Sequence, residues 1–184
     1  MLLPTMQAGL RGASDQAGEP GRTQSGSAQW LAFAASQRRY LFALEHVGEV
    51  LQARDITKIP FTQPWFCGVV NVRGVLHGVI DLEAFLSLGG NAQDGIPHRS
   101  RVHANANSDH MVTFNAALNW PCALAAGSLQ GLRSPADFPG ATDDGSAESP
   151  LLIGIRRDTL NARWLEVDLP AVVASARARG ITAE

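Results

Sequence analysis

Three histidines and an aspartate lie close together near the middle of the sequence. His98, His103 and His110 are spaced by five and seven residues, and Asp109 precedes the last of them. Imidazole and carboxylate groups are ligands of zinc and other transition metals, so these side chains are candidates for a metal site. They fall in a polar stretch of turn-forming residues, where an exposed loop that contains histidines by chance is the simpler explanation. We therefore predict no bound metal.

The two cysteines, Cys67 and Cys122, lie within apolar stretches and lack CxxC spacing. This context favours two buried thiols in a reducing compartment over redox or zinc chemistry. His46 and His77 lie in predicted strands, and spacing provides neither of them with an acid or base partner. The GxGxxG, GxxxxGK[ST], HExxH and GxSxG motifs are also missing from the sequence. We expect no catalytic residue and no cofactor; an enzyme with an unseen metal or thiol site is the alternative.

The composition limits the classes of partner and the cellular location that we expect for this protein. Of 184 residues, 45% are hydrophobic, and 15 Lys and Arg against 17 Asp and Glu give a formal net charge of -2. The basic residues form no run longer than two, so nucleic acid is not an expected partner. No stretch approaches the about 18 apolar residues of a membrane span, and the N-terminus lacks the apolar block of a secretory signal. We expect a cytoplasmic protein without direct membrane insertion, preceded by a flexible tail over residues 1–28 that is rich in small and polar residues.

Short strands are predicted from Trp30 onwards. Apolar residues recur with a period close to two after Trp30 and again across 40–52, and Gln37-Arg38-Arg39 predicts a polar hairpin connection between the two strands. The following segment, 56–66, contains two prolines, which cannot donate to a strand ladder. We expect this segment to be a loop or an edge path.

A second hairpin is predicted over 67–82. Two β-branched runs meet at Arg73-Gly74, and the glycine allows the positive φ of a tight turn. Asp81 follows the second run directly and can cap a short helix over 82–88, which Gly89-Gly90 ends. We therefore expect Asp81 to be a structural helix cap.

The rest of the chain repeats this alternation of strands and loops. We expect a polar connection over 91–110, a hairpin with a continuation over 112–132 and a long exposed loop over 134–150. Residues 151–169 predict two further strands, and a short helix follows over 170–180.

Two blocks of the sequence echo each other. Each runs from a glycine through an apolar strand, a polar turn and a second apolar strand to an Asp-Leu junction and a helix, first from Gly68 to Asp81 and then from Gly154 to Asp168. The glycine-to-aspartate intervals are 13 and 14 residues, and the aspartates are 87 residues apart. The echo favours a mainly β fold of two small, related barrels packed together, with both aspartates as structural caps. The predicted division assigns 29–90 mainly to the first barrel and 101–184 mainly to the second, with exposed loops at 91–100 and 134–150.

Arg73 is the clearest candidate for a binding residue. It stands at the tip of an otherwise apolar hairpin, and its guanidinium offers five donors in a rigid fork to carboxylates or carbonyls of a partner. A solvated turn arginine is the alternative that the residues alone leave open.

The same region resembles the CheW-like domain family. The family pattern is an apolar-x-Glu strand, a proline loop, the motif G-V-x-N-L-R-G and an apolar strand that ends in Asp-Leu. The matching residues are Val47 with Glu49, Ile59-Pro60, Pro64-Trp65-Phe66, Gly68-Val69, Asn71-Val72-Arg73-Gly74 and Ile80-Asp81-Leu82. Val72 replaces the usual leucine, and weaker similarity continues from about 101 to 175.

The resemblance implies a pair of five-stranded SH3-like barrels that bind without catalysis. Such adaptors link the cytoplasmic tip of a chemoreceptor to the regulatory domain of a CheA-type histidine kinase in bacterial chemosensory arrays. By matching positions, the partner-binding residues would be Val47, Glu49, Gly68, Arg73 and Gly74. Asp81 and Asp168 would be structural.

The resemblance leaves some alternatives open. Trp65 after Pro64 and the VNVRG motif are more similar to adaptors of the type IV pilus branch (PilI-like) than to flagellar adaptors. Control of pili and control of flagella both remain possible outputs. The sequence departs from the family at Ala126-Gly127, where an acidic residue is usual, and this places the partner surface of the second barrel in question. A stand-alone CheW-like protein that acts on another partner outside an array is the alternative function.

Overall fold

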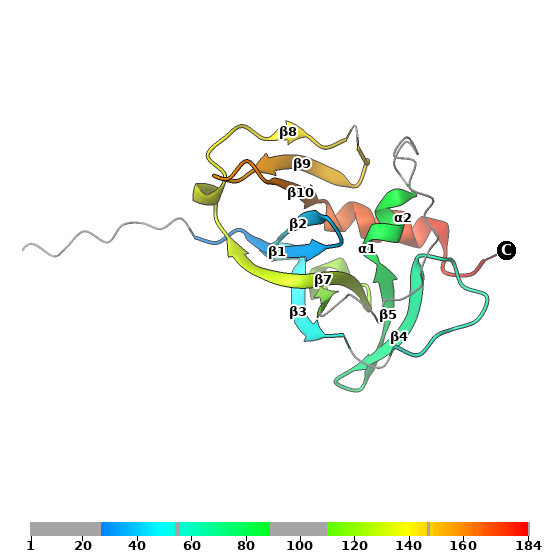
Figure 1. The fold of residues 1–184 in the computed structure, drawn as a ribbon. Helices are drawn as coiled ribbons and strands as arrows, with labels where there is room; N and C mark the ends of the chain where they lie inside the picture. The colour runs from blue at the N-terminus through cyan, green and yellow to red at the C-terminus, as the bar shows by residue number, and fades with distance from the viewer. Residues whose placement is uncertain (1–26, 54–55, 89–109, 147, 184) are drawn as a thin grey trace, which may run out of the picture.

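The computed structural model of the chain describes residues 27–53, 56–88, 110–146 and 148–183, and it is mainly β (Figure 1). The expected tail over 1–28 lies outside the described residues except for its last two positions, and the expected loop over 91–100 lies wholly outside them. The strands are β1 (Trp30–Ala35), β2 (Arg38–Ala43), β3 (Val47–Gln52), β4 (Phe66–Val72), β5 (Val75–Asp81), β6 (His110–Phe114), β7 (Cys122–Arg133), β8 (Asp143–Asp144), β9 (Leu152–Arg157) and β10 (Arg163–Val167). The α-helices are α1 (Leu82–Ser87) and α2 (Leu169–Arg179), and short 3-10 helices are η1 (Leu44–His46), η2 (Ala116–Leu118) and η3 (Pro135–Asp137).

The strands form two units that share the long strand β7. In the first unit the order is β3-β6-β7-β5-β4, and in the second it is β7-β1-β2-β10-β9, with β8 on the outer edge. Each unit contains an antiparallel hairpin, which is β6 with β7 in the first unit and β1 with β2 in the second. In the first unit, β7 runs parallel to β5, and β5 is antiparallel to β4. In the second unit, β2 runs parallel to β10, and β10 is antiparallel to β9. The echo found in the sequence is therefore also a repeat of topology.

Both units are closed by a strand segment that pairs with the outer strand. In the first unit the backbones of Thr57 and Val69 exchange hydrogen bonds of 2.8 and 2.9 Å. In the second, Asp143 pairs with Ile155 across β8 and β9. Gly68 lies at the first of these closures, and a Cβ added there would collide with the Thr57 carbonyl. This close approach of two backbones explains the glycine.

The strand pairing corrects the expected boundary between the barrels. The second unit takes β1 and β2 from the start of the folded chain, because Tyr40, Leu41 and Phe42 pair with Leu165, Glu166 and Val167. The expected single strand over 40–52 is likewise two strands in different units, β2 and β3, with η1 between them. The chain must leave one sheet and enter the other at this point, and alternation of apolar residues does not reveal such a change.

The segment 134–150 also differs from the expected exposed loop. It contains η3 and β8, and Phe138 is 5% exposed. The Phe138 ring lies edge-on to Trp30 and Trp164, with centroid distances of 5.8 and 6.2 Å. One buried aromatic side chain thus anchors an otherwise polar segment inside the second unit, where it adds both apolar burial and ring contacts.

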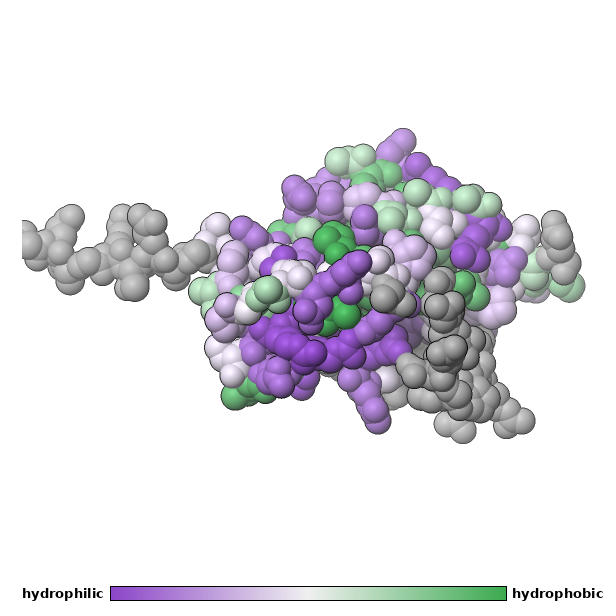
Figure 2. All heavy atoms as spheres, turned by 90° about the horizontal axis from the view of Figure 1, so that it is seen from above, coloured by the Kyte–Doolittle hydropathy of each residue, from purple (hydrophilic) through white to green (hydrophobic). Residues whose placement is uncertain are grey.

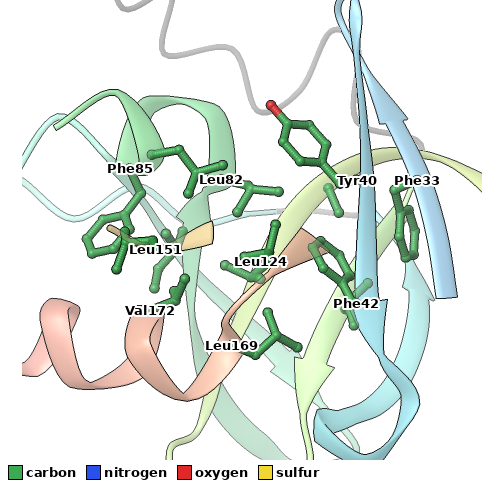
Figure 3. Close-up of a cluster of buried hydrophobic side chains, with 14 of the residues drawn as sticks. Phe33, Tyr40, Phe42, Leu82, Phe85, Leu124, Leu151, Leu169 and Val172 are labelled. Carbon is green, nitrogen blue, oxygen red and sulfur yellow. The ribbon is translucent and has the colours of Figure 1, made fainter. Parts of the chain in front are cut away.

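The main hydrophobic core lies between the two units and is covered by α1 and α2 (Figure 3). Phe33 and Phe42 enter it from the second unit with ring centroids 5.3 Å apart, whereas Leu124 enters from β7. Leu82 and Leu169, the first residues of the two helices, are 0% and 1% exposed. A smaller core fills each unit. Over β8 and β9, the surface is a broad hydrophilic patch broken by small apolar areas (Figure 2).

A polar contact joins the units beside this core. The Tyr40 hydroxyl on β2 donates to Glu83 Oε1 on α1 at 3.2 Å, and Ser36 Oγ donates to Glu83 Oε2 at 2.7 Å. Burial and the nearby Glu83 carboxylate raise the pKa of Tyr40 well above its usual value. The phenol therefore stays a hydrogen-bond donor across the physiological pH range.

Both Asp-Leu junctions have the geometry of an N-cap. Asp81 Oδ1 accepts from the backbone N–H of Ala84 at 3.0 Å, and Asp168 Oδ1 accepts from Ala171 at 3.0 Å. The backbones match as well. The Asp81 N–H donates to the Trp65 carbonyl and the Asp168 N–H donates to the Leu151 carbonyl, both at 2.9 Å, and each acceptor directly precedes the outer strand of its unit. One local structure therefore serves both helices, as the echo predicts.

We expect Asp81→Ala and Asp168→Ala each to lower the free energy of unfolding by about 0.5–2 kcal/mol, because each leaves a helix N–H without its side-chain acceptor. Chemical denaturation measures the loss. Asp81→Asn retains an acceptor and serves as the matched control. An alanine variant as stable as its asparagine counterpart would contradict the capping role.

Phe61 combines a strained backbone with an exposed side chain. Its φ is 58°, its side chain is 86% exposed, and its carbonyl accepts from the Ala183 N–H at 3.0 Å. Left-handed backbone costs a residue with a Cβ roughly 1–2 kcal/mol, and asparagine tolerates it better. We expect Phe61→Asn to raise the free energy of unfolding by about 0.5–1 kcal/mol. Phe61→Ala, which keeps the Cβ without the amide, should gain less; equal gains would show that the backbone strain is not the cause.

Candidate functional site

The Arg73-Gly74 turn has the conformation that its sequence predicts. Val72 pairs with Val75 across a two-residue loop, and Arg73 and Gly74 have φ values of 51° and 87°. Two successive positive φ values are typical of the type I′ turn that matches strand twist. The Gly74 N–H donates to Asn71 Oδ1 at 2.7 Å, which fixes the turn from inside. The Asn-Val-Arg-Gly motif therefore presents the Arg73 side chain at the tip of a rigid hairpin.

The structure brings Arg73 and Glu49 together. Arg73 Nη2 lies 3.1 Å from Glu49 Oε2, and the two side chains are 80% and 43% exposed. Glu49 comes from β3, whose backbone N–H at this residue donates to the Thr113 hydroxyl at 2.7 Å. A pair this exposed adds at most about 1 kcal/mol to stability. The pair leaves most of the Arg73 guanidinium exposed beside the Glu49 carboxylate.

Exposed apolar side chains follow both partners of this pair in the sequence. Val50 is 37% exposed, and Val75 and Leu76 are 55% and 64% exposed. Exposed charged and apolar residues close together in the sequence of two strands are a combination found at protein-binding surfaces, where burial supplies affinity and charge supplies orientation. We call Glu49, Val50, Arg73, Val75 and Leu76 the rim site.

The other residues matched to the family pattern have different environments. Val47 is half-buried and packs against the main core, so it also has a structural role. Gly68 is buried at the barrel closure, where it allows two backbones to approach, and its expected place at or near a partner surface stays a prediction. Gly74 is exposed within the rim-site turn. Ala126 and Gly127 are buried in β7, at the point where the pairing partner of β7 changes from β6 to β1. A carboxylate side chain at this point would be buried.

The candidates for metal or thiol chemistry form no site in the described part of the chain. His98, His103 and Asp109 lie outside it, and no group of three possible ligands is found within it. Cys67 and Cys122 are both buried free thiols. Burial raises the pKa of Cys67 to about 12 and that of Cys122 to about 11.

Two residues of this region were not predicted from the sequence. The Thr113 hydroxyl accepts from the Glu49 N–H, and Gly48 leaves room for that hydroxyl, but no motif or spacing links either residue to Glu49. The one available indication was a hydroxyl residue inside the apolar run of β6.

Fold and site together define a class of protein. Its members consist of two related five-stranded β units of the SH3-like barrel type, and one unit carries exposed charged and apolar residues at its rim. Among the described residues, no helix is long and apolar enough to cross a bilayer. The sequence model of the CheW-like domain matches residues 29–173. The chain therefore belongs to the CheW-like domain family.

Two relatives illustrate the family. Chemotaxis protein CheW of Bacillus subtilis (strain 168) is 33% identical over 58 residues, which are 32% of this chain and 37% of that protein. The alignment thus spans little more than a third of that relative. The crystal structure of the scaffolding protein TtCheW from Thermoanaerobacter tengcongensis superposes with a TM-score of 0.55 at 19% identity, covering 79% of this chain and 91% of that one. This second likeness supports the fold.

We expect both thiols to resist a thiol reagent in the native protein at pH 8, because each is buried and its pKa lies far above that pH. Absorbance of the reagent measures the reaction, and the urea-unfolded protein, in which both thiols should react, is the control. Rapid labelling of the native protein would show that the apolar surroundings of Cys67 or Cys122 open easily.

Proposed function

We propose that this protein is a non-enzymatic adaptor of a bacterial chemosensory array. It links the cytoplasmic tip of a chemoreceptor to the regulatory domain of a CheA-type histidine kinase and acts in the cytoplasm, with flagellar or type IV pilus output. The observation that carries the proposal is the Glu49–Arg73 pair, 3.1 Å apart on the first unit of a chain with a CheW-like domain. The name of TtCheW, a scaffolding protein, agrees with this role.

The rim site is suited to protein recognition rather than catalysis. The Arg73 guanidinium lies in contact with Glu49 through one nitrogen, and its 80% exposure leaves the remaining donors open to a partner. Arginine is one of the residue types that most often dominate the binding energy of an interface. In this proposal the kinase domain binds the rim site.

The strand that carries Glu49 offers a second kind of contact. Within the described residues β3 pairs with β6, and it ends the strand order of its sheet. The unit closes further along the chain, at Thr57, and in the proposal the part of β3 around Gly48 pairs with an added chain. In the proposal, the receptor contacts this strand near Val47, so that the two partners bind neighbouring but separable surfaces.

We expect Arg73→Glu to weaken binding of the kinase regulatory domain at least tenfold, because the change reverses the charge that the partner meets and places it beside Glu49. Arg73 already has a left-handed backbone, so Glu adds no new strain. The melting temperature should fall by less than about 5 °C. Titration calorimetry with the purified kinase domain measures the binding.

Arg157→Glu is the matched control. Arg157 is also an exposed arginine beside a carboxylate, since its Nε lies 3.7 Å from Asp143 Oδ2, but it belongs to the second unit. Equal losses in both variants would mean a general charge effect and contradict a specific rim site. A wild-type protein that binds neither kinase nor receptor would overturn the array role and favour a stand-alone CheW-like protein.

A further inference from the structure

The strand that carries Glu49 has a bulge at this residue. Val47 pairs with Phe114 and Val50 with Val112, so Gly48 and Glu49 together face Thr113 on β6. A bulge interrupts the regular exchange of backbone hydrogen bonds and redirects the side chains of the bulged strand. The direction of the Glu49 side chain is therefore set by whatever holds the bulge.

The Thr113 side chain holds it. This residue is 6% exposed, and its hydroxyl accepts from the Glu49 N–H at 2.7 Å while lying 3.5 Å from the Glu49 carbonyl oxygen. The side-chain oxygen thus takes the place of a backbone acceptor. It also occupies the space beside Gly48, because a Cβ added there would lie 2.5 Å from Thr113 Oγ1. Gly48, Glu49 and Thr113 form one fitted arrangement.

The second unit of the same chain provides an internal comparison. Thr113 pairs with Ala123, which lies beside Val79, and Ala32 pairs with Leu41, which lies beside Glu166. Val79 and Glu166 each precede a capping aspartate by two residues. Ala32 is therefore the counterpart of Thr113.

The counterpart bulge lacks these polar groups. The pairing of β1 with β7 shifts between Ala32, opposite Gly131, and Phe33, opposite Leu129. Here the bulged strand has a glycine with a φ of 91°, and the facing residue is an alanine without a hydroxyl. The second unit thus keeps a bulge without the hydroxyl and without the exposed acid. A bulge alone does not require a threonine, so the hydroxyl accompanies the acidic residue.

We propose that Thr113 is a positioning residue for partner recognition. Its buried hydroxyl fixes the backbone of Glu49, so that the Glu49 carboxylate meets Arg73 and orients the guanidinium for the partner. This inference rests on the proposed function of the rim site. It adds a residue that contacts no partner and acts through Glu49.

The test compares Thr113→Val, which keeps the shape and loses the hydroxyl, with Thr113→Ser, which keeps the hydroxyl. The first readout needs no partner: amide hydrogen exchange at Glu49. We expect exchange at least tenfold faster in Thr113→Val and unchanged in Thr113→Ser, with Leu124, buried in β7, as the internal reference. The second readout is titration of the kinase regulatory domain. There we expect binding about three- to tenfold weaker in Thr113→Val and close to wild type in Thr113→Ser.

Thr62→Val is the control for loss of a hydroxyl elsewhere, since the Thr62 hydroxyl bonds to the Ile59 carbonyl in an exposed loop. Unchanged exchange at Glu49 in Thr113→Val, or equal behaviour of the serine and valine variants, would overturn the positioning role. If Thr113→Val does not fold, Thr113→Ala replaces it, since it matches the residue of the second unit. Failure of the proposed function is distinct: the wild-type protein would then bind no kinase, while the exchange at Glu49 would still decide the role of Thr113.

Discussion

The parallel pairing of β2 with β10 is the constraint on which the second unit depends. It joins Tyr40, Leu41 and Phe42 to Leu165, Glu166 and Val167, which are far apart in the sequence. The first unit, by contrast, is built from strands that follow one another from β3 to β7. Contacts between distant segments carry a larger loop-closure cost than local ones. The rim site therefore lies on the unit whose strands come from one continuous stretch of chain.

The two units differ in their interiors. Where the first has the apolar Val79, the second has Glu166, which accepts from Trp30 Nε1 at 2.9 Å and from Arg156 Nε at 2.7 Å. The Arg156 guanidinium also lies 4.4 Å from the centre of the Trp30 ring. A buried ion pair adds little net stability, but removing one of its partners is costly. Since Trp30 begins β1, this network favours correct docking of the N-terminal strand.

The sequence predicted what local chemistry determines and missed what distant contacts determine. The Arg73-Gly74 turn follows from a glycine between β-branched runs, and the caps at Asp81 and Asp168 follow from an acceptor placed before a helix. The sharing of β7 and the burial of Phe138 depend on partners far away in the chain, which periodicity does not identify. Glu49 and Arg73 were expected at a binding surface from the family pattern, and that remains a prediction, whereas their 3.1 Å contact became visible only in the fold.

Two carboxylates of the chain differ in how much their contacts can add to the stability of the fold. Asp158, in the β9–β10 turn, accepts from the N–H groups of Leu160 and Ala162 and from Trp164 Nε1, each at 2.9 Å. The bond from Trp164 is the main reason why the pKa of Asp158 is lowered, and all three bonds stabilise the fold. The carboxylate of Glu49 instead meets an arginine that is 80% exposed, where solvent screens most of the attraction. The first unit nevertheless holds it with a bulge, a left-handed Arg73 and a buried hydroxyl. Such local constraints add little to the stability of the folded chain; in the proposed function, they reduce the entropy lost when a partner binds.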